Sequence, residues 1–274
     1  MKAPKFSIII PTLNEEKFLP KLLDSLSHQT KTNFEVIVVD GKSKDATVSV
    51  ANSYTEKVPS LTTIISEKRG LPVQRNLGAT TATGEWLLFI DADSVLLPYC
   101  ISQIDTYITR ESPTFFTSWC TPDSNDIGDA LIVLFWNLVL ESLIRLKRQL
   151  SPGPLTVIRK DVFSEIGGYD LTHDFNEDVD LSLRLYKHGI ALSMLRETVY
   201  VVSLRRLRAQ GKLKVAQQYV QASLPVLFFS KSLSKMPGYI MGGHLYDKKK
   251  KPLKSLELKS INKKLQAILK DLFR

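Results

Sequence analysis

Short runs of β-branched and aromatic residues alternate with helical segments in the first third of the chain, and this alternation constrains the fold most strongly. The strand-like runs are residues 6–10, 34–39, 61–65 and 86–90. Apolar residues recur at helical spacing over residues 18–26, 46–54 and 73–82. Because the strands are almost continuously apolar, burial on both faces is indicated. We therefore expect an α/β fold with a Rossmann-like, mostly parallel central sheet flanked by helices.

The remaining sequence continues with helices and strands before its character changes near residue 205. Helices are expected at residues 98–109, 126–147 and 177–188 and just after Lys160, and strands at residues 114–119, 155–158, 191–195 and 199–202. The later sequence reads as helices with lysine on one face, including one with apolar positions between residues 256 and 272. We expect one α/β domain over residues 1–203 and a basic helical C-terminal extension over residues 204–274.

Charge is unevenly distributed between these two parts. The chain carries a net charge of +9, and the extension holds 17 Lys and Arg against three acidic residues. The preceding part holds 20 basic and 25 acidic residues. Such an asymmetry favours an anionic partner for the extension, either membrane lipid or nucleic acid. A solvated lysine-rich tail would give the same distribution.

Cysteine content and apolar run lengths bear on location. Cys100 and Cys120 follow no metal-binding spacing and form no disulfide framework, which fits a reducing cytosol. The five-residue run before Pro11 is too short for a signal peptide. The longest apolar run, residues 130–140, has 11 residues and includes Asn137, against the roughly 20 that span a bilayer. We expect a cytoplasmic protein with no transmembrane helix.

Polar segments flank the predicted strands, at residues 11–16, 40–45, 70–78 and 91–93. In a parallel sheet such loops converge on one edge, where open α/β sheets bind their ligands. Asp91 and Asp93 follow a buried strand at positions i and i+2. Mg²⁺ and Mn²⁺ are commonly held by one or two carboxylates together with substrate phosphates. The pair therefore indicates a metal that carries a phosphorylated substrate, although Asp-x-Asp after an apolar run is also a common turn.

Taken in order, these motifs resemble the family-two inverting nucleotide-sugar glycosyltransferases with a GT-A fold. The matching segments are residues 8–16, 35–41, 74–78, 84–93 and 176–184, with Gly189 behind them. Together they span about residues 6–203 at family-like spacing. The resemblance implies a catalytic domain that moves a sugar from a nucleoside diphosphate-sugar to an acceptor hydroxyl, in the synthesis of cell-envelope glycans or glycolipids. UDP is the favoured donor base and GDP the next.

The resemblance also assigns residues to the nucleotide-sugar. Pro11, Thr12 and Glu15 occupy the first nucleotide loop, and Asp40 matches the carboxylate that hydrogen-bonds the base. Asp40 is followed by Gly41, whereas many relatives carry a second acid there. This departure weakens the assignment of the base contact.

Three further carboxylates are assigned to the reaction itself. Asp91 matches the residue near the ribose and sugar, and Asp93 matches the ligand of Mn²⁺ or Mg²⁺. A metal there would neutralise charge on the leaving diphosphate. Asp178 matches the catalytic base that takes the proton of the acceptor hydroxyl, so that one direct displacement inverts the anomeric configuration. Acids at this helix start would also serve as capping residues, with Asn176 as the N-cap.

Basic and histidine residues have less specific signals. Arg75 either reaches the base or diphosphate, or ties its own loop to the sheet. Arg205 and Arg206 stand where a basic residue of resembling enzymes meets the diphosphate, and they are equally the first charges of the basic extension. His173 and His244 are potential metal ligands, but a lone histidine is more often structural, and neither is assigned to the site.

Two apolar stretches suggest contact with a membrane. Residues 127–146 are apolar nearly all round, and residues 224–229 form a second stretch among basic residues. Apolar and aromatic patches bordered by lysine suit an interfacial segment on an anionic membrane. We expect peripheral attachment at the cytoplasmic face, with a lipid-linked acceptor as a corollary. A dimer interface or an ordinary core would use the same residues.

Other functional classes fit the sequence less well. A sugar nucleotidyltransferase needs a glycine-rich phosphate loop after the first strand, and residues 11–16 contain no glycine. A dinucleotide dehydrogenase lacks its Gly-x-Gly-x-x-Gly motif. A non-catalytic lipid or nucleic-acid binder would explain the basic extension but not the acidic loops. Nucleic acid is therefore an unfavoured partner.

Overall fold

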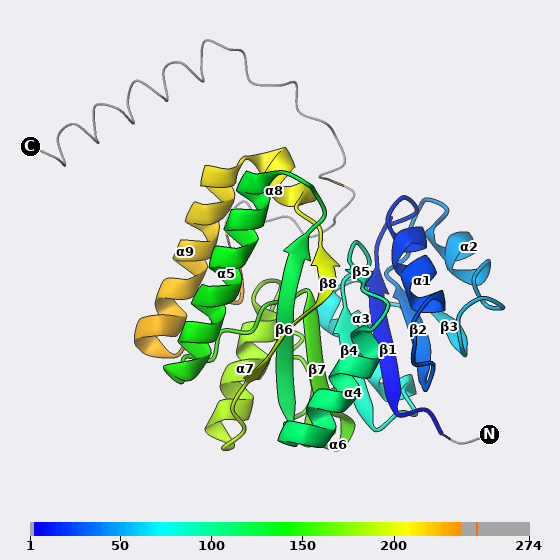
Figure 1. Cartoon of the computed structure of the whole chain (residues 1–274), viewed down its shortest axis with the longest axis horizontal. Helices are drawn as coiled ribbons and strands as arrows, with labels where there is room; N and C mark the ends of the chain where they lie inside the picture. The colour runs from blue at the N-terminus through cyan, green and yellow to red at the C-terminus, as the bar shows by residue number, and fades with distance from the viewer. Residues whose placement is uncertain (1–2, 237–244, 246–274) are drawn as a thin grey trace, which may run out of the picture.

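The structure, a computed structural model, describes residues 3–236 and residue 245 of the chain (Figure 1). Its centre is an eight-stranded sheet in the order β3-β2-β1-β4-β7-β6-β8-β5. The strands are β1 (Phe6–Thr12), β2 (Phe34–Asp40), β3 (Leu61–Ile65), β4 (Trp86–Ile90), β5 (Val95–Leu96), β6 (Phe115–Pro122), β7 (Leu155–Arg159) and β8 (Ser193–Val202). The helices are α1 (Leu19–Ser27), α2 (Thr47–Asn52), α3 (Leu71–Thr81), α4 (Cys100–Glu111), α5 (Ile127–Arg145), α6 (Lys160–Glu165), α7 (Glu177–Lys187), α8 (Arg205–Gln210) and α9 (Lys212–Phe229).

The first four strands form the parallel half of the sheet, as the sequence predicts. β1 lies between β2 and β4, and β2 also pairs with β3, all in parallel. Thr12, the last residue of β1, is in register with Asp40, the last residue of β2. The loops that follow these strands therefore open at the same edge of the sheet.

The second half of the sheet is mixed. β7 pairs antiparallel with β4 and β6, whereas β8 pairs parallel with β6 and antiparallel with β5. The two strands predicted at residues 191–195 and 199–202 are one continuous strand, β8. The prediction divided it because Arg196 and Glu197 interrupt the apolar pattern, but both residues are exposed, and register shifts against β6 accommodate the interruption.

Both faces of the sheet are covered by helices, which explains the continuous apolar strands. Ile8 and Ile10 of β1 point into a core shared with α1 and α4, whereas Ile9 points into a second core shared with α3, α6 and α7. Helix α3 lies very close to β1, because a Cβ atom added at Gly78 would come within 2.4 Å of Ile9 Cγ2. The mostly parallel α/β architecture with flanking helices is thus confirmed.

Helix α5 bears on the expectation that no transmembrane helix is present, which stays a prediction. It has 19 residues with a mean hydropathy of 1.8, enough to cross a membrane by length and composition alone, and 28% of it is buried. The longest apolar run is shorter than the helix because Asp129 and Glu141 bound it. These two side chains, and that of Asn137 within the run, are buried against the rest of the protein.

The described part of the predicted C-terminal extension packs on the α/β body. Leu204 belongs to the core shared with α1 and α4. Val226 of α9 packs with Leu140 of α5 and with Val179 of α7. The division at residues 203 and 204 stays a prediction, and the apolar helix expected between residues 256 and 272 lies outside the described residues.

Candidate functional site

The first two predicted loops meet at the carboxyl ends of β1 and β2. Asp40 is almost fully buried there. Its carboxylate accepts hydrogen bonds from Thr12 Oγ1 (3.0 Å), from the backbone N–H of Ser43 (2.8 Å) and from Ser43 Oγ (2.5 Å). Pro11 precedes Thr12 inside β1 and is also buried. Pro11, Thr12 and Asp40 therefore form a preorganised polar corner at the edge of the sheet.

Arg205, the first residue of α8, reaches back into the loop that follows β1. It donates to both carboxylate oxygens of Glu15, from Nη1 at 2.9 Å and from Nη2 at 2.6 Å. Its Nε lies 2.8 Å from Asp93 Oδ2, and its guanidinium carbon lies 4.4 Å from the centroid of the Phe18 ring. Arg205 and Glu15 are 8% and 6% exposed. The structure thus brings together Glu15, Asp93 and Arg205, each of which the sequence assigns to the donor.

Arg75 of α3 occupies a second buried cluster beside the first. Its side chain is 1% exposed. Nη1 donates to Glu177 Oε1 at 2.8 Å, and Nη2 donates to Asp91 Oδ1 at 3.1 Å and to the carbonyl of Gly153 at 3.2 Å. The guanidinium also lies 5.2 Å from the centroid of the Tyr169 ring. Arg75 therefore joins the end of β4 to the start of α7 rather than anchoring only its own segment.

Asp178, the predicted base, stands beside Glu177 in the first turn of α7. Burial, with the neighbouring charge of Glu177 as a further cause, raises the pKa of Asp178 to about 7, and Arg75 opposes the shift. The backbone approaches the carboxylate closely, because a Cβ added at Gly153 would lie 3.1 Å from Asp178 Oδ2. A carboxylate with such a raised pKa is suited to exchange a proton near neutral pH.

The two aspartates after β4 are also perturbed. Burial raises the pKa of Asp93 to about 6, while Arg205 favours the charged form. Burial likewise raises the pKa of Asp91, against the influence of Arg75. Their side chains are 18% and 35% exposed, so solvent or a ligand reaches them. Partial exposure distinguishes these two carboxylates from the nearly buried Glu15 and Glu177.

Charge counting tests whether a divalent cation fits this region. Among the described ion pairs of the two clusters, Arg75 and Arg205 are shared by Glu15, Asp91, Asp93 and Glu177, with Asp178 next to them. The carboxylates outnumber the guanidinium groups, and their oxygens are the ligand type that Mg²⁺ and Mn²⁺ prefer. The donor set therefore fits a divalent metal at Asp93 that has diphosphate oxygens as its other ligands.

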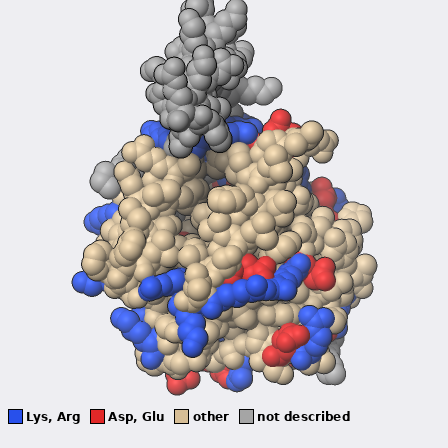
Figure 2. Space-filling view, turned by 60° about the vertical axis from the view of Figure 1, so that its left-hand side comes forward, with Lys and Arg blue, Asp and Glu red and all other residues tan. Residues whose placement is uncertain are grey.

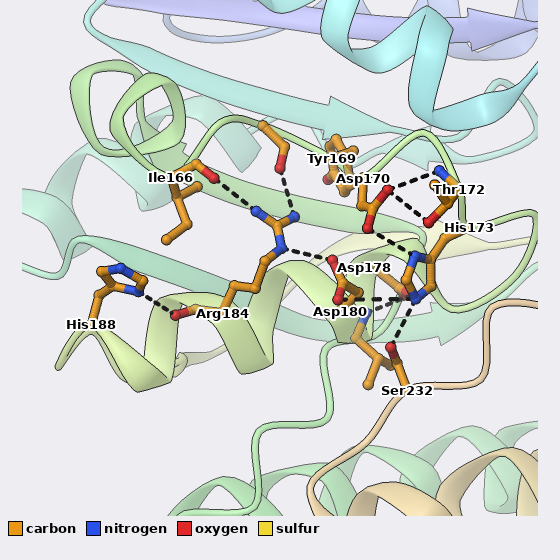
Figure 3. Close-up of polar contacts among 12 residues, drawn as sticks. Ile166, Tyr169, Asp170, Thr172, His173, Asp178, Asp180, Arg184, His188 and Ser232 are labelled. Carbon is orange, nitrogen blue, oxygen red and sulfur yellow. Dashed lines mark hydrogen bonds and ion pairs between the residues drawn. The ribbon is translucent and has the colours of Figure 1, made fainter.

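His173 lies in a different cluster, beside the first turn of α7 (Figure 3). Its Nδ1 is 3.6 Å from Asp170 Oδ2, its Nε2 is 3.9 Å from Asp180 Oδ1, and Nε2 is 3.0 Å from Ser232 Oγ. Asp170, His173 and Asp180 are close enough to hold a metal ion. However, Asp180 already accepts a 2.7 Å hydrogen bond from Arg184, which is the i,i+4 helix pair predicted from the sequence.

Arg206 does not share the partners of Arg205 at the edge of the sheet. Arg206 donates to Gln218 Oε1 at 2.8 Å and to Gln210 Oε1 at 3.4 Å, which ties α8 to α9. His244 lies outside the described residues. Sequence reasoning missed the role of Glu177 as a partner of Arg75, because an acid in a first helical turn is sufficiently explained by the helix dipole. It also missed Gly153, for which spacing gives no signal. Tyr169 belongs to the segment 167–170, which the sequence suggests is either a loop near the acceptor or only a turn.

Known proteins of similar sequence share one enzymatic description. The model of the family described as Glycosyl transferase family 2 matches residues 7–167. An "Uncharacterized glycosyltransferase" of Haemophilus influenzae is 32% identical over 184 residues, which cover 65% of this chain and 61% of that protein. A "PGL/p-HBAD biosynthesis glycosyltransferase" of Mycobacterium tuberculosis is 30% identical over 194 residues, which cover 69% of this chain and 72% of that protein. The chain thus spans less than two thirds of the first of these relatives.

Two solved structures share the fold. TarS 1-349 of S. aureus in complex with UDP-GlcNAc is similar at a TM-score of 0.61 and 24% identity, over 73% of this chain and 58% of that chain. The mannosyltransferase PcManGT from Pyrobaculum calidifontis, in complex with GDP-Man and Mn²⁺, is similar at a TM-score of 0.65 and 20% identity, over 85% of this chain and 67% of that chain. The central sheet and its helices are a GT-A fold.

Proposed function

The chain belongs to glycosyl transferase family 2, and we propose on that basis that it transfers a sugar from a nucleoside diphosphate-sugar to an acceptor hydroxyl. The observation that carries this proposal is the pair of arginine-linked carboxylate clusters at the edge of the sheet. Arg205 joins the nucleotide loop at Glu15 to Asp93, and Arg75 joins Asp91 to the helix start that holds Asp178. The residues proposed to bind the donor thereby lie next to the residue proposed to deprotonate the acceptor.

Asp178 acts as the general base in the proposed reaction. Its carboxylate accepts the proton of the acceptor hydroxyl while the acceptor oxygen bonds to the anomeric carbon. The bond from that carbon to the diphosphate oxygen breaks in the same step, so the nucleoside diphosphate leaves with the bonding electrons and the configuration inverts. The raised pKa of Asp178 supports this role, because proton transfer is most effective when the pKa of the base lies near the working pH.

The donor side uses the remaining polar residues. Asp40 and Thr12 receive the base and ribose, and Arg205 turns part of its hydrogen bonding toward the diphosphate when the donor binds. Mn²⁺ or Mg²⁺ held by Asp93 would supply Lewis-acid stabilisation of the leaving diphosphate. Arg75 keeps Asp91 and Glu177 in position and is shielded from the donor by its 1% exposure.

The names and bound ligands of similar proteins support a proposed class of donor and of acceptor. Solved neighbours contain UDP-GlcNAc and GDP-Man, which supports a UDP-sugar as the first candidate donor and a GDP-sugar as the second. The names of relatives include a PGL/p-HBAD biosynthesis enzyme and a poly(ribitol-phosphate) β-N-acetylglucosaminyltransferase. These names support a role in building cell-envelope glycans or glycolipids, with a lipid-linked hydroxyl as the acceptor.

Donor turnover with defined metals tests the proposal. We would measure hydrolysis or transfer from UDP-, GDP- and dTDP-sugars with Mn²⁺, Mg²⁺ or EDTA. The wild type is compared with Asp178→Asn, and with Asp161→Asn as a matched control on an exposed carboxylate outside the site. One donor that turns over in the wild type and the control, but not in Asp178→Asn, is the expected result. Failure of every donor to bind with any metal would overturn the proposal.

A further inference from the structure

Helix α5 is built with its polar side turned inward. Asp129, Asn137 and Glu141 are 6%, 4% and 9% exposed, although they are the polar residues of an otherwise apolar helix. The side chains that face solvent are Ile127, Leu131, Ile132, Leu134, Phe135 and Leu138, between 36% and 77% exposed. A surface helix of a soluble protein normally has the opposite arrangement.

The buried polar residues fix α5 to the body and explain why this face points inward. The side-chain amide of Asn137 donates to the carbonyl of Cys120 at 2.9 Å and accepts from its N–H at 3.3 Å. Asp129 accepts from Ser124 at 2.7 Å, and Glu141 pairs with Arg196. Rotating α5 to bury its apolar face would break these contacts. They therefore keep the apolar face of α5 exposed to solvent.

Helix α9 extends the same surface. It runs beside α5 in the same direction, because Lys212 pairs with Asp129 at 2.8 Å near the starts and the rings of Tyr219 and Trp136 lie 5.4 Å apart further along (Figure 1). Its exposed apolar residues are Tyr219, Val220, Leu224, Phe228 and Phe229, between 42% and 73% exposed. We call the exposed apolar residues of the two helices the α5–α9 face.

Basic residues border the α5–α9 face mainly where the two helices end. Exposed basic residues there are Arg145 in the last turn of α5, Lys147 and Arg148 after it, and Lys231 after α9. At the other end, Lys212 and Lys214 lie in the first turn of α9, where Lys212 pairs with Asp129 and Asp126 is also exposed. Figure 2 shows a broad surface with few charged side chains above a band in which Lys and Arg are interspersed with Asp and Glu. An apolar centre with a cationic border where the two helices end matches a lipid surface with anionic headgroups.

We propose that the α5–α9 face lies in the interface of an anionic lipid bilayer, with both helices parallel to the membrane plane. A spanning orientation of α5 is disfavoured, because its contacts with Cys120 and Arg196 fasten it to β6 and β8 of the central sheet. A second copy of the chain is a poorer occupant. The ends of α5 and α9 at Arg145 and Lys231 are basic, so a two-fold dimer that joined these ends would place basic residues against basic residues.

The α5–α9 face lies close to the helix that holds Asp178, the candidate base. Leu140 of α5 and Val226 of α9 pack on Val179 and Leu183 of α7, whose first turn contains Asp178. A membrane bound at this face lies against the elements that support the candidate base. Resting on the proposed function, the acceptor hydroxyl would then belong to a lipid-anchored molecule delivered from that membrane.

Vesicle binding by the full chain, measured without any donor, tests the membrane proposal independently of catalysis. Because both native cysteines are buried, Phe228→Cys can be labelled selectively with an environment-sensitive fluorophore, with Ile65→Cys on edge strand β3 as the matched control. We expect a blue shift and a gain in fluorescence at residue 228, but not at residue 65. The vesicles contain phosphatidylcholine with added phosphatidylglycerol.

A variant of the α5–α9 face distinguishes its contribution to vesicle binding from that of basic residues elsewhere in the chain. Leu131→Gln/Phe135→Gln/Phe228→Gln changes only exposed side chains and should weaken vesicle binding at least about tenfold. Its melting curve is compared with that of the wild type to establish folding. Unchanged vesicle binding by this variant, or a water-like signal from residue 228 on bound protein, would overturn the proposal. A wild-type dimer that ignores vesicles and is dissociated by the variant would assign the face to a second copy instead.

Discussion

Glu15 and Arg205 form a bidentate ion pair although they are 190 positions apart in the chain. The pair connects the first loop of the sheet to the helix that follows its last strand in the chain. Arg205 also contacts Asp93, so one guanidinium group balances two carboxylates at the proposed donor site. Single-residue variants can test how much this pair stabilises the protein and what the neighbouring carboxylates contribute to turnover and metal binding.

Arg205→Ala should destabilise the protein by roughly 3–5 kcal/mol, because it leaves the buried Glu15 carboxylate without its guanidinium partner. Urea unfolding of both proteins measures this change. Arg208→Ala is the matched control, since Arg208 pairs with Asp123 at the surface and is 46% exposed. Its loss should cost less than about 1 kcal/mol. Equal losses in the two variants would contradict the structural importance of the Glu15–Arg205 pair.

Asp178→Asn should lower turnover by about 10²–10⁴ while raising thermal stability above pH 7. The pKa of Asp178 is about 7 when folded against a usual 3.8, so the folded state binds the proton more tightly. Ionisation therefore costs stability progressively as pH rises from about 4 to about 7, and the neutral amide avoids that cost. A gain on the order of 1 kcal/mol corresponds to about 2–4 °C in Tm. A lower Tm at pH 8 would contradict the raised pKa.

The pH dependence of turnover should report on the pair at the start of α7. We expect activity to fall as pH drops below about 7, because protonated Asp178 cannot accept the hydroxyl proton. Glu177→Gln removes a negative charge beside Asp178, which lowers the pKa of Asp178 and moves the acid limb to lower pH. Initial rates from pH 5 to pH 9 check both statements. A limb that stays in place in Glu177→Gln would assign it to another group.

Metal binding should distinguish the two acidic clusters. Asp93→Asn is expected to weaken Mn²⁺ binding in the presence of nucleoside diphosphate at least about tenfold, because it removes a carboxylate ligand. His173→Ala should leave the affinity unchanged, since Asp170, His173 and Asp180 form a separate group. Electron paramagnetic resonance of free Mn²⁺ measures both. Weaker Mn²⁺ binding in His173→Ala, with unchanged binding in Asp93→Asn, would place the metal at Asp170, His173 and Asp180 instead.

Local sequence patterns predicted most of the architecture. The four parallel strands and the loops after them follow from apolar runs and from the rule that ligands bind at the carboxyl ends of strands. Asp40, Asp91 and Asp93 could therefore be placed at one edge of the sheet from the order of strands and loops alone. The length of α5 was predicted closely, whereas β8 was divided in two because the exposed Arg196 and Glu197 interrupt its apolar pattern.

Long-range pairing was beyond the reach of sequence patterns. Arg75 meets Glu177 across 102 positions, and Arg205 meets Glu15 across 190 positions. Nothing in local spacing links such residues. The sequence therefore allows Arg75 to be either a ligand contact or an anchor of its own loop, and it explains Glu177 by the helix dipole alone. The outward apolar face of α5 was equally hidden, because composition gives the amount of apolar surface but not its direction.

The connection between the two ends of the domain also has a consequence for biosynthesis. At roughly 5–20 residues per second, about 10–40 s separate the emergence of Glu15 from that of Arg205. Until Arg205 emerges, the Glu15 and Asp93 carboxylates lack their guanidinium counterion. A chain whose synthesis ends before α8 would therefore keep a nucleotide edge that is still strongly acidic.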